Sequence, residues 1–159
     1  VIALAWTEAY FDGCTPADLT RFGNKLHQVS PRLQFWATFV EKPRGKYETN
    51  PVPSAVDVLV VTVWYATTPS VIARKSADAL PGWIQKSTGR PLLVQWCATA
   101  NNLIPKTQPE TMQKLAESLA EYSLSGLVLG HYGKWANAQG LETNRRVEQA
   151  VWEVFKRLE

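Results

Sequence analysis

Five short apolar runs, separated by segments with a different pattern, constrain the fold of this chain more than any other feature. The run at residues 56–64 is almost continuously apolar, as expected for a strand of a parallel sheet that is covered on both faces. Segments with helical spacing follow four of the five runs. We therefore predict five strands, at residues 2–7, 33–40, 56–64, 92–97 and 127–132.

The intervening segments carry signals for where helices begin and end. Thr15 is a predicted N-cap, with Pro16 at the first helical position and Asp18 in the first turn. Prolines in the segment 42–55 predict a loop, and Pro81 and Gly82 can interrupt the helix that they fall in. The predicted helices span roughly residues 16–29, 68–86, 108–122 and 143–158.

This order leaves two architectures open. Short strands that alternate with helices form a parallel sheet with right-handed crossovers. The first architecture is a single five-stranded, doubly wound α/β domain, and the second is five consecutive units of a (β/α)8 barrel. In both, function is expected at the carboxyl ends of the strands. No Gly-rich phosphate loop follows any strand, since 10–13 reads YFDG, and this disfavours a nucleotide-binding doubly wound domain.

Composition bounds the range of partners. The chain has 159 residues, 45 % of them hydrophobic and 19 % charged, which is typical of one globular domain. The net charge of +3 comes from scattered Lys and Arg, so neither a nucleic acid nor a membrane is an expected partner. Cys14 and Cys97 fit no zinc pattern and are expected as two thiols, although one bridge between their loops stays open. We expect no metal and no cofactor.

Three carboxylates follow the first two strands. Glu8 lies two residues after Trp6, so Trp6, Glu8 and Tyr10 face the same way if the strand continues. A carboxyl among aromatic rings has a raised pKa and can act as a general acid, or it can be structural. Asp12 and Glu41 are candidates for a second catalytic carboxylate. Asp57 begins its strand, and we expect a structural role for it.

Aromatic and polar residues also gather at the predicted strand ends. Flat aromatic faces stack on the apolar faces of sugar rings, so these residues favour a saccharide site, although about half of them are expected to pack under loops. Three tryptophans within elements, Trp36, Trp83 and Trp152, are assigned to packing, and His27 is assigned a structural role. The predicted binding residues are Trp6, Tyr10, Trp64, Tyr65, Gln95, Trp96, His131, Tyr132 and Trp135.

An ordered set of motifs resembles part of a known family. The set is AWTEAYFDG (5–13), HQVSPRLQFWATFVE (27–41), AVDVLVVTVWY (55–65), RPLLVQW (90–96) and SGLVLGHYGKW (125–135). It resembles the C-terminal five strands of glycoside-hydrolase-like (β/α)8 barrels, which carry catalytic carboxylates at barrel strands four and seven. The resemblance implies a partial barrel of strands four to eight, and a hydrolase of oligosaccharides or polysaccharides with Glu8 as acid.

Two departures from the family pattern keep alternatives open. The strand expected to carry the nucleophile ends in Gln95 and Trp96, without an acid. Barrel strands one to three have no counterpart in the 159 residues, so another polypeptide is expected to supply them, or the chain is a fragment. The alternatives are a degenerate barrel that binds saccharide without catalysis, and a doubly wound binding or signalling domain. An extracellular or periplasmic location is favoured.

Overall fold

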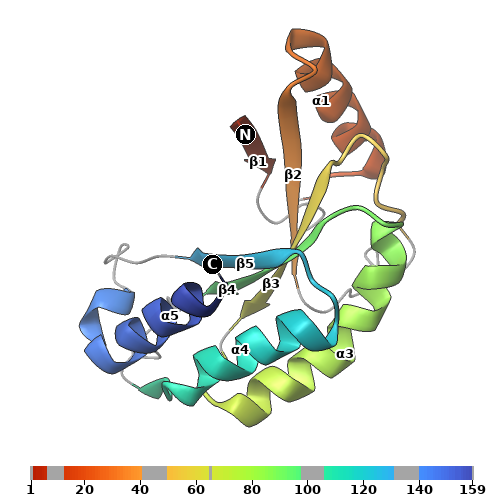
Figure 1. Cartoon of the computed structure of the whole chain (residues 1–159). Coiled ribbons are helices and arrows are strands. Elements are labelled where there is room, and N and C mark those ends of the chain that lie inside the picture. Colours follow the sequence, from red (N-terminus) through yellow and green to blue (C-terminus); the bar gives the residue numbers. More distant parts are fainter. Residues whose placement is uncertain are drawn as a thin grey trace.

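The computed structural model describes residues 2–6, 13–40, 50–64, 66–97, 106–130 and 140–158. Helices and strands alternate through these ranges (Figure 1). The strands are β1 (Ile2–Trp6), β2 (Leu33–Val40), β3 (Val58–Trp64), β4 (Leu92–Cys97) and β5 (Gly126–Gly130). The helices are α1 (Pro16–Val29), α3 (Pro69–Ser87), α4 (Glu110–Glu121), the 3₁₀ turn η2 (Leu141–Thr143) and α5 (Arg145–Leu158).

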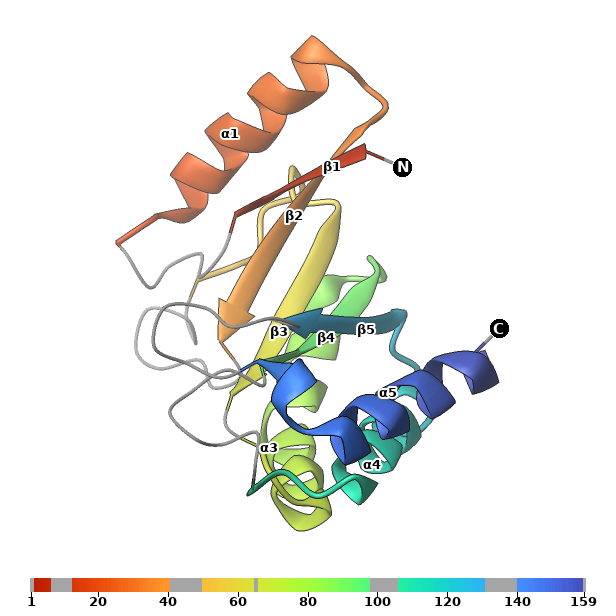
Figure 2. The same ribbon diagram turned by 90° about the vertical axis from the view of Figure 1, so that its left-hand side faces the viewer.

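The strands form one parallel sheet whose spatial order is the sequence order. Among the described residues, each strand pairs only with its sequence neighbours, from β1 beside β2 to β4 beside β5. The strands fan around from β1 to β5, so that the sheet is curled like half of a barrel (Figures 1 and 2). A doubly wound sheet reverses its strand order at a switch point. The sequential order therefore confirms the partial-barrel prediction and makes the doubly wound alternative wrong.

The sheet has one face covered by helices, which we call the helix face. Right-handed crossovers that always step in the same direction place every helix on one side of a sheet. Phe35 and Phe39 of β2 and Val61 of β3 pack with α1 and α3, and Phe39 stacks on Trp83 at 4.8 Å between ring centroids. Val94 and Trp96 of β4 pack in a second cluster with α3, α4 and α5.

Residues that alternate with these along the strands form the opposite, inner face. In register across the sheet, Thr38 pairs with Val60, and Thr62 pairs with Gln95. Thr38, Val60 and Thr62 are all buried although they point away from the helices. Because a closed barrel fills its interior with side chains, burial of this face fits the curled sheet.

Helix ends shift by one or two residues from the sequence prediction, and three further details of the elements also differ from it. Helix α3 continues through Pro81. Proline has no N–H to donate to the carbonyl four residues earlier, but Pro81 is exposed, so this missing hydrogen bond lies on the solvent side of the helix. Strand β3 begins at Val58, because the Val56 N–H bonds to the Pro53 carbonyl in a turn. Strand β5 begins one residue early, at Gly126, where a Cβ would lie 3.2 Å from the Leu93 side chain.

The amino ends of the strands are held by side chains that bond the backbone. The Asp57 carboxylate accepts the Phe35 N–H at 2.7 Å and contacts His27 Nε2 at 2.8 Å, which is the structural role predicted for both residues. The Arg90 guanidinium donates to the carbonyl oxygens of five residues at this end of the sheet, Val52, Pro53, Val56, Lys86 and Ser87. Burial lowers the pKa of Arg90, and the charge of Asp57 acts in the opposite direction.

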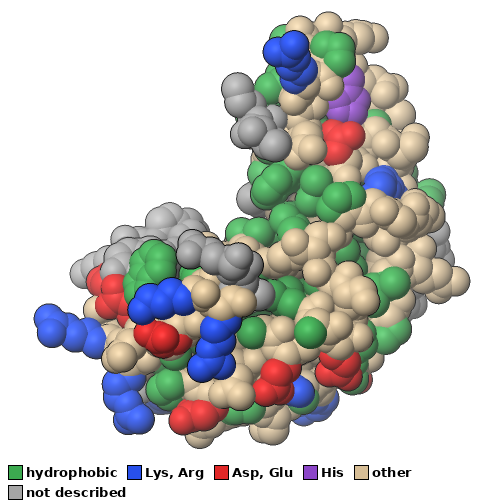
Figure 3. Space-filling view, viewed as in Figure 1, with side chains coloured by type: hydrophobic (Ala, Val, Ile, Leu, Met, Phe, Trp, Pro, Cys, Tyr) green, Lys and Arg blue, Asp and Glu red, His purple; other side chains and the backbone are tan. Residues whose placement is uncertain are grey.

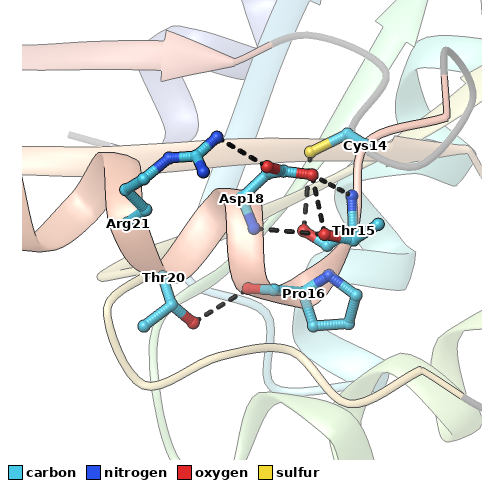
Figure 4. A network of polar contacts seen from close by, with 6 residues as sticks. All are labelled: Cys14, Thr15, Pro16, Asp18, Thr20 and Arg21. Atoms are coloured by element: carbon cyan, nitrogen blue, oxygen red, sulfur yellow. Dashed lines mark hydrogen bonds and ion pairs between the residues drawn. The ribbon is translucent and has the colours of Figure 1, made fainter.

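Helix α1 begins with the predicted N-cap. Thr15 and Asp18 form a capping box, in which the Asp18 N–H bonds Thr15 Oγ1 and the Asp18 carboxylate accepts the Thr15 N–H at 3.0 Å (Figure 4). Arg21 donates to the same carboxylate at 2.7 Å. The Thr15 hydroxyl also donates to this carboxylate, at 2.7 Å. This bond contributes most to the lowered pKa of Asp18, followed by the bond from the Thr15 N–H, and Arg21 adds to the shift.

Within the described ranges, no helix combines the length and the apolar composition that a membrane crossing requires.

Candidate functional site

The carboxyl ends of the five strands lie at one edge of the sheet, as parallel pairing requires. In barrels of parallel strands this edge is where substrates bind. Every predicted site residue lies in one of these strands or in the connection that follows it. The last residues of the strands are Trp6, Val40, Trp64, Cys97 and Gly130.

The three predicted catalytic carboxylates belong to connections outside the described residues. Glu8 and Asp12 follow β1, and Glu41 follows β2 directly. Strands β1 and β2 are paired neighbours, with Trp6 opposite Ala37. The catalytic role of these carboxylates therefore stays a prediction. In the sequence they follow two strands that are neighbours in the sheet. The predicted binding residues Tyr10, Tyr65, His131, Tyr132 and Trp135 lie outside the described residues as well.

Gln95 lies on the inner face near the end of β4. Its Oε1 accepts a hydrogen bond from Thr62 Oγ1 at 3.1 Å, across the paired strands β3 and β4. The Thr62 side chain is only 1 % exposed. A buried hydroxyl is stable when it is hydrogen-bonded, so this bond fixes the position of the Gln95 amide.

Trp96 lies on the opposite face of the same strand. It is 1 % exposed, and its indole N–H donates to the Ala66 carbonyl at 3.1 Å. A ring enclosed in this way has no face open for a sugar, so its position fits packing under a loop, which the sequence analysis allowed for about half of these aromatics. Of the two predicted neighbours at the end of β4, only Gln95 lies on the inner face. Trp6 and Trp64 end their strands, and their binding role stays a prediction.

Sequence reasoning missed the polar groups of the inner face. Thr38 and Thr62 are buried there, and Trp36 donates its indole N–H to Gln34 Oε1 at 3.0 Å. Trp36 is half-buried and does not belong to the packed core of the helix face, although its place within a strand led us to assign it to packing. The available signal was the two-residue spacing from Gln34 through Trp36 to Thr38, which places the three side chains on one face.

The tryptophans in helices take different positions. Trp83 is buried, as predicted. Trp152 of α5 is 53 % exposed, so it is not a core residue, although its ring lies 6.0 Å from that of Phe155. Among the described residues, no group of three or more His, Cys, Asp or Glu could hold a metal ion. Cys14 carries a thiol that lies 3.6 Å from the Thr15 carbonyl oxygen.

The surface of the molecule has a hollow on one side. The hollow lies between the part that carries α1 and the part that carries α4 and α5 (Figure 3). Hydrophobic side chains line this hollow, whereas charged side chains gather over α4 and α5. Strands β1 and β5 are the two end strands of the sheet.

No protein-family model matches this chain, and no curated protein sequence matches it. Solved structures do match it, and three are from the chitinase of Pyrococcus furiosus. The catalytic domain of the hyperthermophilic chitinase has a TM-score of 0.65 at 12 % identity, over 98 % of this chain and 61 % of that chain. Catalytic-site mutants of active domain 2 complexed with chito-oligosaccharides have a TM-score of 0.67 at 12 % identity, over 99 % of this chain and 62 % of that one.

A third structure, of catalytic-site mutants of active domain 2, has a TM-score of 0.62 at 12 % identity, over 97 % of this chain and 60 % of that one. This chain thus spans about three fifths of the length of each structure that it matches. At 12 % identity the likeness establishes the fold. The described residues therefore have the fold of part of a (β/α)8 barrel, and the chitinase catalytic domains that match this chain are similar to it in fold.

Proposed function

We propose that this chain is a carbohydrate-active barrel domain that hydrolyses glycosidic bonds in an oligosaccharide or polysaccharide, with Glu8 as general acid. The observation that carries the proposal is the sequential parallel sheet, which the chain shares with chitinase catalytic domains and which leads at its carboxyl edge into Glu8. This edge is the functional one in barrels of this kind. A carboxyl group supplies the proton that the leaving oxygen needs.

The second carboxylate of the proposed mechanism is Asp12 or Glu41. A retaining enzyme needs a nucleophilic carboxylate about 5–5.5 Å from the acid, and an inverting enzyme needs a base about 6.5–9.5 Å away. Gln95 cannot serve as either, because an amide carries no negative charge. Its amide can instead orient a sugar hydroxyl or the acid, from the position that Thr62 fixes at 3.1 Å.

The proposed substrate is an oligosaccharide that stacks on aromatic rings at the same edge. Trp6, Trp64 and the aromatic residues of the connections supply these rings in the proposal, with His131 bonding a hydroxyl. One of the matching chitinase structures contains chito-oligosaccharides. Chito-oligosaccharides are therefore the first substrates to test on this chain.

A second candidate function is saccharide binding without catalysis. Gln95 stands where the family resemblance calls for an acid, and its bond to the buried Thr62 gives the amide a structural task. A barrel that has lost its second carboxylate still keeps its aromatic rings and can bind sugars.

The test compares wild type with Glu8→Gln on a series of chito-oligosaccharides and on soluble glucans. The substitution keeps the size of the side chain but removes the proton donor, so hydrolysis should fall by roughly 10²-fold or more while binding survives. Glu121→Gln, an exposed carboxyl on α4, is the matched control and should change neither. Product formation by chromatography and binding by calorimetry give the two measurements.

Each outcome decides between the two candidates. Equal hydrolysis by wild type and Glu8→Gln would rule out the acid role. Binding by wild type without hydrolysis would support the non-catalytic candidate, and the absence of both would contradict the saccharide proposal altogether. The assay uses the chain together with a polypeptide that supplies further barrel strands, which we include among its proposed partners.

A further inference from the structure

Thr62 of β3 carries a buried hydroxyl that has one hydrogen-bond partner among the described residues. The residue is 1 % exposed, and its Oγ1 lies 3.1 Å from Gln95 Oε1. Gln95 lies directly opposite on β4 and is half-buried. The pair therefore joins a hydroxyl that is enclosed in the sheet to a side-chain amide that is partly open.

The pair lies near the carboxyl edge of the sheet. Register places Thr62 beside Val40, the last residue of β2, and Gln95 beside Val128 of β5. Of these four residues, only Thr62 and Gln95 have side chains that form hydrogen bonds. In the sequence, Val40 is followed by Glu41, one of the carboxylates of the proposed mechanism. The amide of Gln95 thus belongs to the edge of the sheet at which the proposed saccharide site lies.

The burial of Thr62 determines which end of the amide it contacts. A side-chain amide has a carbonyl oxygen that accepts hydrogen bonds and an NH2 group that donates them. If the amide were turned over, Nε2 would donate to Thr62 Oγ1, and the Thr62 hydroxyl proton would have no acceptor among the described residues. A buried donor without an acceptor is unfavourable. Thr62 therefore donates its proton, and Gln95 Oε1 accepts it.

This direction of the bond restricts what Gln95 offers to any other group. With Oε1 turned toward Thr62, the amide presents Nε2, which has two N–H donors and does not accept. A favourable partner of Nε2 is therefore an acceptor. Without the Thr62 hydroxyl, a half turn of the amide exchanges its oxygen and nitrogen, so that Gln95 can either donate or accept. The bond from Thr62 selects one of these two states.

From this geometry we propose that Thr62 is a positioning residue, which fixes Gln95 as a hydrogen-bond donor to an oxygen of the bound saccharide. The inference rests on the proposed function, because it takes the ligand to be a saccharide. It adds Thr62 to the proposed site and gives the direction of one contact with the ligand. It also gives a reason for an amide at this position, since a glutamate would accept the same bond from Thr62 but would turn an acceptor oxygen toward the ligand.

The first test reverses the direction of the proposed contact with Gln95→Glu. The carboxylate keeps an acceptor for Thr62 but replaces the N–H donors with an oxygen. Affinity for chito-oligosaccharides, measured by calorimetry, should fall at least about 10-fold at pH 7. As the pH falls toward 4, the carboxyl group gains a proton that it can donate, so the affinity relative to wild type at the same pH should recover.

The second test removes the hydroxyl that fixes the amide. Thr62→Val keeps the shape of the side chain but allows the amide to turn over, so the affinity should fall at least about 3-fold. Thr62→Ser keeps the hydroxyl and should restore most of the affinity. Thr38→Val makes the same substitution at another buried threonine of the inner face and is the matched control, which should leave the affinity unchanged.

A third measurement needs no saccharide. Nitrogen NMR relaxation should give the Gln95 side-chain amide an order parameter of about 0.85 in wild type and in Thr38→Val, and below about 0.6 in Thr62→Val. If Thr62→Val fails to fold, the wild-type order parameter and the Gln95→Glu affinities still decide.

Three results would each overturn the proposal. They are a mobile Gln95 amide in wild type, equal losses of affinity in Thr62→Val and Thr38→Val, and full affinity of Gln95→Glu at pH 7. A chain that holds the amide fixed through Thr62 but binds no saccharide would contradict the proposed function while supporting the positioning role of Thr62.

Discussion

The two faces of the sheet differ in what their side chains do, and adjacent residues of β4 show the difference. Trp96, on the helix face, is enclosed among apolar side chains of α3, α4 and α5. Gln95, on the inner face, bonds a hydroxyl of the neighbouring strand. Adjacent residues of a strand point to opposite faces of the sheet. One of them can therefore pack against helices while the next offers a polar group to a binding site.

This comparison shows that a strand end is too coarse a description of a barrel site. A residue reaches the mouth only if it lies at the carboxyl end and also on the inner face. Trp96 satisfies the first condition and fails the second. The helix face should therefore respond to substitution with large losses of stability, and the inner face with smaller ones.

The first prediction compares the two faces directly. Trp96→Ala should lower the free energy of unfolding by about 3–5 kcal/mol, because it leaves a large cavity in the core. Thr62→Val, on the inner face, keeps the shape of the side chain but removes the bond to Gln95, and should cost about 1 kcal/mol. Urea denaturation followed by circular dichroism measures both values. If Thr62→Val cost as much as Trp96→Ala, the distinction between the faces would fail.

The second prediction tests how closely a helix packs on the helix face. Gly23 of α1 is buried, and a Cβ built there would lie 2.5 Å from the Ala55 carbonyl oxygen and 3.0 Å from Phe35. Gly23→Ala should therefore destabilise the chain by about 1–3 kcal/mol, although alanine is the better helix former.

Gly82 of α3 supplies the matched control for this prediction. It is exposed, and a Cβ there would meet nothing within 4 Å. Gly82→Ala should therefore stabilise the chain by about 0.5–1 kcal/mol, through helix propensity alone. Opposite signs for the two variants in thermal and urea unfolding would support close packing of α1. The same sign for both would contradict it.

The order of elements could be predicted from the sequence, because apolar runs, caps and prolines are local signals. Strands β2 and β4 have the predicted bounds, and α1 begins at the predicted cap. The face on which a residue of β4 lies could not be predicted. The strand has apolar residues on both faces, so the alternation of its side chains does not show which face is turned toward the helices. Pairing with β3 decides it, and that pairing is a long-range contact.

The candidate site was less predictable for a related reason. The position of Glu8 after β1 follows from the sequence, but the polar partner of Gln95 does not. Thr62 stands alone among apolar residues of β3 and becomes meaningful only when the register places it opposite Gln95. Trp152 shows the same limit in a helix, because spacing predicts that a helix has an apolar side but does not say whether anything covers it.

The last prediction concerns the start of α1, where an exposed charge acts far from both packed faces. The pKa of Asp18 is lowered in the folded chain, chiefly by the hydrogen bonds from Thr15. Its contribution to stability is therefore fully present above the unfolded pKa, near 3.8, and is lost as the pH falls through the lower folded value. The stability difference between wild type and Asp18→Asn should then shrink between pH 5 and about pH 2. Thr15→Ala, which should cost about 1 kcal/mol at neutral pH, removes the hydroxyl donor but keeps the backbone N–H donor, so it should weaken this pH dependence without abolishing it. Urea midpoints measured across that range for the three proteins test the assignment, and a constant difference between wild type and Asp18→Asn would show that the capping bonds do not stabilise the charged form.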